Sequence, residues 1–334
     1  MARTTPARPL DIEAVFPQLS EFRATATRLH PRPAVVDASQ SSVGGPLLWP
    51  ADEAWPTCPQ EHRYGRAALI SEIRERRRLL ADAWTRVPAP GARQGPDEAE
   101  QELLRTLGRK SVKAPETEHY RSLLPLAQVY ARDVPDLPWP DDADLLQLLW
   151  CPYDAHGATG YEPLLTVVWR RAEDVGDVLR EPPLPVAVGY EGYVAEPCAL
   201  NPERVTEHQD IELLPDRLRD RLEDWEDWDD DDAPRYSTDL SVAPGWKTGG
   251  FAAWPVTGPA RLLCECGDPM SLLVRIASSE WDGGTMSWIP LEDRATADAY
   301  DASVPTQVVV GRGGSLNVFV CDKDVRHQIR LSVQ

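Results

Sequence analysis

The chain of 334 residues is long enough for two average domains or one large duplicated one, and its core needs no disulfide framework. It has 35 lysines and arginines against 54 aspartates and glutamates, and the resulting net charge of −19 argues against nucleic acid as a partner. The longest apolar stretches run to about six residues, so no membrane span is expected. The six cysteines are too sparse for a disulfide scaffold and the N-terminus lacks the apolar core of a secretory leader, so we expect a cytoplasmic protein.

The 32 prolines favour short strands and fixed turns over long helices, so we expect an α+β fold in which strands predominate. Residues 1–42 are predicted to form an N-terminal helical segment. Their pattern from Asp11 to Leu29 indicates one helix, broken near Pro17, that packs on the unit that follows it.

A repeated pattern organises the remainder of the chain. The run GGPLLWP at 44–50 recurs with identical spacing as GGFAAWP at 249–255. Each run is followed by a cysteine, by a strand-like segment, and by a second such segment that ends on cysteine. Features in this shared order predict a tandem duplication of a sheet-forming unit, packed as one compact pseudo-symmetric body. Copy one spans 43–180 and copy two spans 241–334.

The repeated glycines and Trp-Pro pairs have a structural explanation. Glycine permits backbone angles that other residues avoid, and Trp-Pro sets an extended turn whose indole can cover a sheet edge. We interpret the following positions as structural corners without chemistry: Gly44, Gly45, Trp49, Pro50, Gly249, Gly250, Trp254 and Pro255. The expected strands are 126–131 and 144–151 in copy one and 272–277 and 314–321 in copy two.

Copy one is longer than copy two because of residues near 63–122. The patterns at 67–84 and 97–110 predict that this surplus is a helical insertion. From Glu61 to Arg121 the net charge is +3 in an otherwise acidic chain. The insertion could therefore dock on the acidic linker described next, or on a larger complex.

Residues 181–240 join the copies as an acidic linker. Between Glu203 and Asp232 there are fourteen acidic residues and four arginines, with the run EDWEDWDDDD at 223–232 at the centre. Such a run is either a solvated loop that keeps the protein soluble or a surface for a basic partner, and tryptophans within it favour the second role. The predicted partner-binding residues are Trp225, Trp228, Asp229, Asp230, Asp231, Asp232 and, in copy two, Trp281.

Catalytic motifs are missing from the sequence. No nucleophile elbow, phosphate-binding loop or His-Glu-x-x-His helix occurs, and GRGGSL at 311–316 fits a hairpin turn that leads into a strand. We therefore predict no catalytic residue, and an enzyme is the less favoured class.

Each copy offers four soft metal ligands. They are Cys58, His62, Cys151 and His156 in copy one, and Cys264, Cys266, Cys321 and His327 in copy two. If neighbouring strands of a copy lie side by side, each set could form a tetrahedral structural zinc site of the Cys2His2 or Cys3His type. The alternative is that the thiols pack as small hydrophobic side chains, which the tight Cys264-x-Cys266 spacing favours in copy two. Cys198, outside both sets, is interpreted as a core residue.

An ordered set of segments spans both copies: SSVGGPLLWPADEAWPTCP, LAQVYARDVPDLPWPDDADLLQLLWCPYDAH, APGWKTGGFAAWP, CECGDPM and LLVRIASSEWDGG. Together they resemble the YwqG-like bacterial proteins, a family of unknown function. The resemblance implies tandem β-rich repeats, a distant similarity to the C-terminal part of the programmed-cell-death-2 chaperones of a ribosomal protein, and an occasional neighbourhood with toxin systems. It supplies no catalytic residue. The chain departs from the family pattern in its helical insertion and in CECG, where a wider Cys-x-x-Cys-Gly is frequent.

These observations favour a non-enzymatic protein-binding module that masks or chaperones a basic protein, with toxin immunity as one form of that role. Two alternatives stay open. A pocket between the copies could bind a small ligand or a substrate, with Asp282 and Glu292 as candidate acids. The chain could also be an accessory subunit that docks through its helical insertion.

Overall fold

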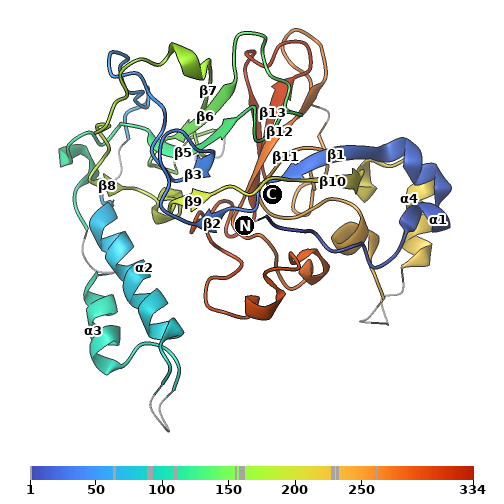
Figure 1. The fold of residues 1–334 in the computed structure, drawn as a ribbon, viewed down its shortest axis with the longest axis horizontal. Coiled ribbons are helices and arrows are strands. Elements are labelled where there is room, and N and C mark those ends of the chain that lie inside the picture. The colour runs from blue at the N-terminus through green and yellow to red at the C-terminus, as the bar shows by residue number, and fades with distance from the viewer. Residues whose placement is uncertain are drawn as a thin grey trace.

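The computed structural model describes residues 2–62, 65–88, 93–107, 111–154, 156–157, 162–226, 230, 233–260 and 262–334. Within these ranges, two six-stranded antiparallel sheets form the centre of the molecule, and helices lie at its two ends (Figure 1). This mixed arrangement with prominent strands confirms the predicted α+β class.

The first sheet has the order β10-β1-β11-β12-β13-β14 and the second has the order β2-β9-β3-β5-β6-β7. The strands of the first sheet are β10 (Glu203–His208), β1 (Arg23–Arg28), β11 (Lys247–Gly249), β12 (Met270–Ala277), β13 (Ser315–Cys321) and β14 (Arg330–Val333). Those of the second are β2 (Arg32–Pro33), β9 (Cys198–Ala199), β3 (Ser42–Val43), β5 (Leu124–Tyr130), β6 (Leu145–Trp150) and β7 (Leu165–Arg170). A small third sheet pairs β4 (Ala68–Leu69) with β8 (Ala187–Val188).

The α-helices are α1 (Ile12–Val15), α2 (Ile70–Thr85), α3 (Glu98–Leu107) and α4 (Asp216–Trp225). Short 3-10 turns are η1 (Pro17–Phe22), η2 (Ala114–Glu116), η3 (Ala172–Asp174), η4 (Glu191–Tyr193), η5 (Ile211–Leu213), η7 (Met286–Trp288) and η8 (Arg294–Thr296), and η6 (Tyr236–Leu240) is a π-turn. Within the described ranges, no helix is both long and apolar enough to cross a membrane.

The two sheets share one plan. Strands β11 to β14 occupy the positions in the first sheet that β3, β5, β6 and β7 occupy in the second. Each sheet is then completed by a strand from outside its own copy. Strand β1 of the N-terminal segment pairs with β11 of copy two, and β9 of the segment 181–240 pairs with β3 of copy one. Their chain neighbours β2 and β10 cross over to the opposite sheets as edge strands. This reciprocal exchange agrees with the predicted repeat, whose origin by duplication stays an inference from the sequence.

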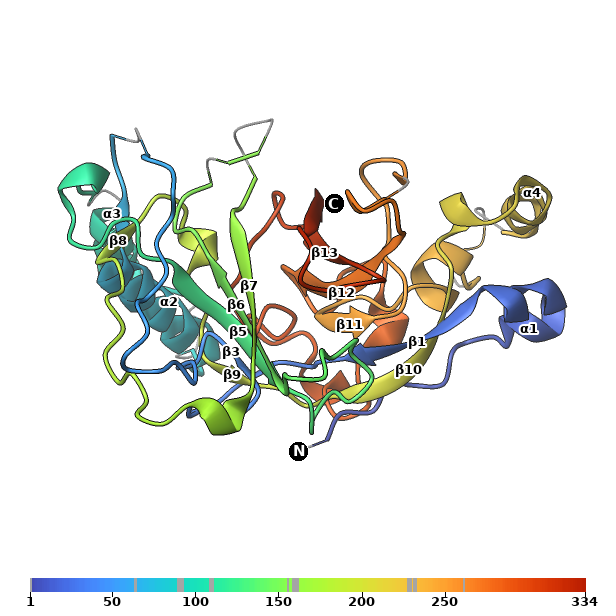
Figure 2. The ribbon, with the colours of Figure 1, turned by 90° about the horizontal axis from the view of Figure 1, so that it is seen from above.

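The main core lies where the two sheets meet. Its largest cluster combines Leu126 and Leu148 of the second sheet with Val274 and Val318 of the first. Strands β6 and β13 are buried at every position, because each has a strand on both sides and packed side chains on both faces. Seen from above, the strands of the two halves form two walls that face each other (Figure 2).

The N-terminal segment differs from the expected broken helix. Helix α1 ends at Val15, η1 begins at Pro17, and from Arg23 the chain is the strand β1. The run RATATR alternates residues on two faces and contains β-branched threonines, which suit a strand better than a helix. The short helices also do not pack on copy one, because Ile12 and Leu19 lie against Leu218 of α4 and Tyr236.

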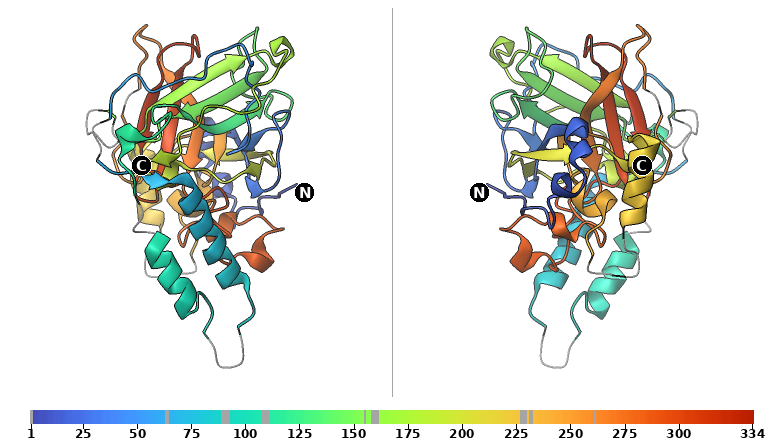
Figure 3. Two further views of the ribbon diagram at one scale, coloured as in Figure 1. Left: turned by 90° about the vertical axis from the view of Figure 1, so that its left-hand side faces the viewer. Right: turned by 90° about the vertical axis from the view of Figure 1, so that its right-hand side faces the viewer.

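The segment between the copies is more than a linker. It supplies β9 and β10, which pair in both sheets, and the docking surface for α2. Arg76 and Arg77 of α2 form ion pairs with Glu191 and Glu196 at 2.5 and 2.8 Å. The helical insertion therefore contacts the first part of the segment 181–240, whereas α4, which leads into the acidic run, lies at the opposite end of the molecule (Figures 1 and 3).

Candidate metal centres

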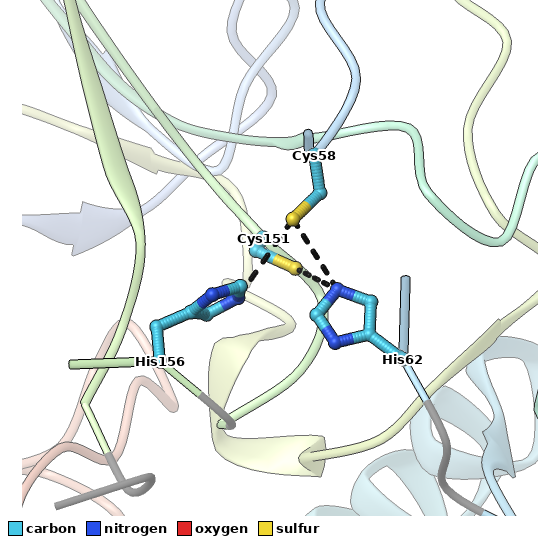
Figure 4. A group of neighbouring side chains, drawn as sticks. All are labelled: Cys58, His62, Cys151 and His156. Atoms are coloured by element: carbon cyan, nitrogen blue, oxygen red, sulfur yellow. Dashed lines mark hydrogen bonds between the residues drawn. The ribbon is translucent and has the colours of Figure 1, made fainter. Parts of the chain in front are cut away.

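The first cluster, site 1, gathers all four predicted ligands of copy one. Cys58 and His62 lie in the loop that follows the GGPLLWP run, Cys151 directly follows β6, and His156 lies in the next loop. Their side chains point toward one another (Figure 4), and all four residues are buried. The β5–β6 hairpin brings the two chain segments together, as the sequence interpretation required.

The distances within site 1 suit a small central ion. His62 Nε2 lies 3.3 Å from Cys58 Sγ and 3.1 Å from Cys151 Sγ. His156 Nε2 lies 3.9 Å from Cys58 Sγ. A tetrahedral ion with bonds of about 2.0 to 2.3 Å holds its sulfur and nitrogen ligands about 3.3 to 3.8 Å apart. The three distances lie near this range, and all four donor atoms lie within 4.8 Å of one another.

Neighbouring groups orient the ligands of site 1. The His62 ring stacks on Tyr153 with centroids 4.4 Å apart. His156 Nδ1 lies 3.0 Å from Oε1 of Gln60, and Arg121 donates to the carbonyl oxygen of Cys58 at 2.8 Å from its Nε. Outer contacts of this kind fix the ring tautomer and the loop in metal sites.

A nearby cation would stabilise the thiolate forms of the two buried cysteines, Cys58 and Cys151. The hydrogen bond from Cys151 lowers the pKa of the Cys58 thiol, whereas burial raises the pKa of Cys151. The pair on its own therefore holds one thiolate readily, and a second buried thiolate is unfavourable without a positive charge nearby. A bound metal ion would supply that charge.

The second cluster, site 2, gathers the four predicted ligands of copy two. Cys264 Sγ lies 3.4 Å from His327 Nδ1, and Cys266 Sγ lies 3.5 Å from Cys321 Sγ. The tight Cys264-x-Cys266 spacing, which favoured packed thiols, does not keep these side chains apart, because a turn at 265–267 directs both toward the end of β13. Site 2 is more open than site 1, since Cys266 is exposed and the His327 side chain is 37 % exposed.

The two sites occupy matching places in the two sheets. Cys151 directly follows β6, and Cys321 is the last residue of β13, its counterpart. In each half the tryptophan of the repeated run packs beside the thiols, Trp49 near Cys58 and Cys151, and Trp254 near Cys264 and Cys321. The repeated glycines also have the role expected of them: Gly44, Gly249 and Gly250 adopt φ values of +65°, +64° and +66°, which other residues avoid. Both four-residue clusters could hold a metal ion.

Three of the seven predicted partner-binding residues, Trp225, Asp230 and Trp281, lie in the part of the chain that the structure describes. Trp225 packs its ring edge-on against Phe16 at 5.8 Å, and Trp281 is 4 % exposed. Asp230 is exposed. Trp228, Asp229, Asp231 and Asp232 lie outside the described residues.

A cavity that the sequence did not reveal lies between α2 and the second half. It has a volume of about 490 Å³ and its walls include Arg32, Arg74, Arg77, Trp281, Asp293 and Tyr300. The predicted acids do not line it: Asp282 accepts hydrogen bonds from Gly284 and Thr285 in its own turn, and Glu292 accepts two from Thr4. Their neighbours Trp281 and Asp293 line it instead. Only the docking of the insertion creates this space, so no local pattern could have found it.

A buried polar network also escaped sequence reasoning. His30 contacts Glu203 at 3.1 Å, and the side chains of Arg28 and Glu280 are buried beside them. Burial alone would raise the pKa of Glu280, but the hydrogen bond from His30 and the charges of Arg32 and Arg28 bring it below its ordinary value. These residues come from distant parts of the chain and share no motif.

The chain matches no protein-family model, and no curated protein resembles it closely enough in sequence to be reported as a relative.

Proposed function

We propose that this protein is a non-enzymatic binding protein whose two halves are each held by a structural zinc ion, and which masks or chaperones a basic protein partner. The observation that carries this proposal is the pair of complete ligand sets, Cys2His2 and Cys3His. Catalytic zinc sites usually have three protein ligands and an open position for water, whereas four protein ligands close the ion off. Closed sites in both halves support a structural role.

Zinc is the metal that the donor atoms favour. Thiolate and imidazole in a tetrahedral arrangement select zinc over calcium and magnesium, which prefer oxygen ligands. In site 1, Cys58, His62, Cys151 and His156 would join the loop after the Trp-Pro turn to the end of β6. In site 2, Cys264, Cys266, Cys321 and His327 would join the equivalent loop to β13. Bound zinc would supply a positive charge between the thiolates and tie loops that carry little regular structure.

The charge of the chain supports a basic protein as the partner. The net charge is −19, and about half of it comes from the segment 203–232. A field of this sign accelerates encounter with a positively charged protein and makes binding sensitive to salt. The resemblance to the YwqG-like proteins supports the same class of function, with toxin immunity as one version.

Elemental analysis tests the zinc part. Protein purified without chelator should contain two zinc ions per chain, and the variants Cys58→Ser and Cys266→Ser should each contain one. Cys198→Ala is the matched control, because Cys198 is buried but lies outside both clusters. It should keep both ions. Zinc below about a tenth of an ion per chain in the wild type would overturn the proposal for both sites.

Affinity capture tests the partner part. Tagged protein should retain a stoichiometric basic protein at low salt and lose it at high salt. Replacing Asp229, Asp230, Asp231 and Asp232 with asparagine should weaken the capture. A matched control replaces Glu98, Glu102, Glu116 and Glu118 of the insertion with glutamine, which changes the net charge equally. Equal effects of the two variants would show that the acidic run has no specific role.

A small-ligand binder is the second candidate, and the cavity beside α2 is the observation that favours it. Its volume of about 490 Å³ is in the range of small-molecule sites, and it contains the carboxyl groups of Asp293 and Asp301. The pKa of Asp301 is raised, chiefly by burial, while hydrogen bonding to Arg32 brings the pKa of Asp293 below its ordinary value despite burial. Thermal-shift screening with a metabolite collection tests this candidate. A ligand whose stabilisation is lost in Trp281→Ala would support it.

A further inference from the structure

Strand β7 ends the second sheet with an unpaired edge. Cys151 N–H donates to Leu164 C=O at 2.9 Å, one step beyond the paired residues Trp150 and Leu165. Hydrogen-bonded pairs alternate along an antiparallel ladder, so the N–H and C=O groups of Leu165, Val167 and Trp169 point away from β6. Within the part of the chain that the structure describes, no hydrogen bond engages these six groups. They form a row of three donors and three acceptors.

The other long sheet edges are protected, whereas β7 is not. Edge strand β2 has only two residues and contains Pro33, and β10 carries the charged residues Glu203 and Arg204, which are not buried. Strand β14 has four residues and begins with Arg330. By contrast, LTVVW in β7 is uncharged from Leu165 to Trp169. Folds usually block such edges with charge, proline or short length, and an open apolar edge accepts another strand.

A groove runs along this edge. It has a volume of about 500 Å³, and its two walls are the consecutive residues 165–169 of β7 and 325–329 of the loop before β14. The side chains of Val167, Trp169, Val325 and Ile329 belong to the apolar cluster between the sheets. A strand added to β7 would place alternate side chains against this apolar face.

The second wall of the groove, residues 325–329, includes a residue of site 2. His327 lies in the middle of 325–329 and belongs to site 2, and Cys321 of the same site begins the loop. Arg326 also forms an ion pair with Asp142 at 2.5 Å, across to the other half. The position of this wall relative to β7 therefore depends on the ligands that hold the loop.

We propose that the groove along β7 binds an extended peptide segment of a partner protein, which pairs with Leu165, Val167 and Trp169 as an added strand and directs apolar side chains at alternate positions toward Val325 and Ile329. The occupant follows from the chemistry of the edge, because a row of backbone donors and acceptors with a period of two matches only another extended backbone. The net charge of −19 favours a basic protein as its source. This inference rests on the protein-binding role proposed above and adds the recognition mode.

Selection from a phage-displayed library of random peptides of about twelve residues tests the groove. Zinc-loaded protein should enrich sequences with apolar residues at every second position. A fluorescein-labelled consensus peptide should then bind with an affinity measurable by anisotropy. N-methylation of alternate peptide amides should abolish binding, whereas methylation of the intervening amides should have little effect. Equal tolerance at all amides, or no enrichment over the library, would overturn the proposal.

Val167→Pro is the decisive protein variant. Its N–H points outward, so proline removes no hydrogen bond of the sheet. The variant should keep its far-ultraviolet circular dichroism and zinc content but bind the peptide at least about tenfold more weakly. Val167→Thr, which keeps the N–H, should bind as the wild type does. Unchanged peptide affinity in Val167→Pro would overturn the proposal, as would a wild-type dimer that Val167→Pro converts to monomer, because the occupant would then be a second copy of this chain.

Cys266→Ser separates this inference from the zinc proposal. If zinc in site 2 holds the wall, this variant should bind the peptide about tenfold more weakly, whereas Cys198→Ala should bind normally. Normal binding by Cys266→Ser would overturn the link to site 2. Where elemental analysis finds no zinc, the proposal for the metal fails, and the comparison of Val167→Pro with Val167→Thr still decides whether β7 is the peptide site.

Discussion

His156 Nδ1 lies 3.0 Å from the side-chain oxygen of Gln60, two residues along the chain from Cys58. Because an amide oxygen only accepts, Nδ1 carries the proton and Nε2 presents its lone pair toward the thiols. The contact therefore sets the tautomer that a metal ligand needs, and it joins the two loops of site 1 at a second point.

Gln60→Ala should lower the zinc affinity of site 1 by about 10- to 100-fold, since loss of such an outer contact frees the ligand ring. Competition with a fluorescent zinc chelator measures the change, and site 2 serves as the internal reference. Gln101→Ala is the matched control, because Gln101 lies on α3 and its side chain donates to the carbonyl oxygen of Pro96, just before that helix. If Gln60→Ala and Gln101→Ala gave the same affinity, Gln60 would have no role in orienting the ligand.

The two proposed zinc sites should lose metal at different rates. All four ligands of site 1 are buried, whereas Cys266 of site 2 is exposed and His327 is partly so. Excess chelator should therefore remove one ion rapidly and the other slowly, as followed by an indicator dye. Cys266→Ser should lack the fast phase, and Cys58→Ser should lack the slow one. A single rate for both ions would contradict the difference in access.

Arg77→Ala should destabilise the protein by about 2 kcal/mol, because this side chain satisfies several acceptors at once. It donates to the carbonyl oxygens of Val194 and Gln307 at 2.7 and 3.2 Å and to Glu196 at 2.8 Å. Urea unfolding of zinc-saturated protein measures the change.

Arg78→Ala is the control for that measurement. Arg78 follows Arg77 on α2, but it is exposed, and its ion pairs among the described residues are with Glu75 and Asp82 of its own helix. Its loss should cost less than about 0.5 kcal/mol. Equal destabilisation by the two variants would mean that α2 does not dock through Arg77.

Glu203→Gln should make the stability less dependent on acid pH. Burial raises the pKa of Glu203, but hydrogen bonds from His30 and Thr5 outweigh it and bring that pKa below the ordinary value of 4.5. A carboxyl group with a lowered pKa in the folded state stabilises the protein above pH 4.5, and this contribution is lost as the pH falls further.

Denaturant midpoints between pH 3 and pH 7 give the comparison. Wild type should exceed Glu203→Gln in stability at pH 7, and the difference should shrink below pH 4.5. Glu212→Gln, at an exposed position in η5, should shift the curve little. A difference between wild type and Glu203→Gln that stayed constant across this range would show that the titration of Glu203 does not contribute.

Local patterns in the sequence predicted the elements that depend on local physics. Segments 144–151 and 314–321 are rich in apolar residues and end on cysteine, and the structure has β6 and β13 there. The apolar pattern at 67–84 predicted α2, and the repeated glycines predicted backbone angles that other residues avoid, which Gly44, Gly249 and Gly250 adopt. The eight members of the two candidate metal sites could also be named, because cysteine and histidine are rare in this chain and recur in both copies.

Local patterns predicted the long strands β5, β6, β12 and β13 and grouped the thiols and imidazoles by copy, since composition and period are properties of a short stretch of chain. The same patterns missed β1, whose residues were expected to be helical. The exchange of β1 and β9 between the sheets and the closure of a cavity over Trp281 by α2 depend on the tertiary structure. So does the free edge of β7, with which no second strand pairs among the described residues. These features follow from pairings between residues more than a hundred positions apart, and such pairings depend on how whole elements bury their surfaces together, which no local pattern encodes.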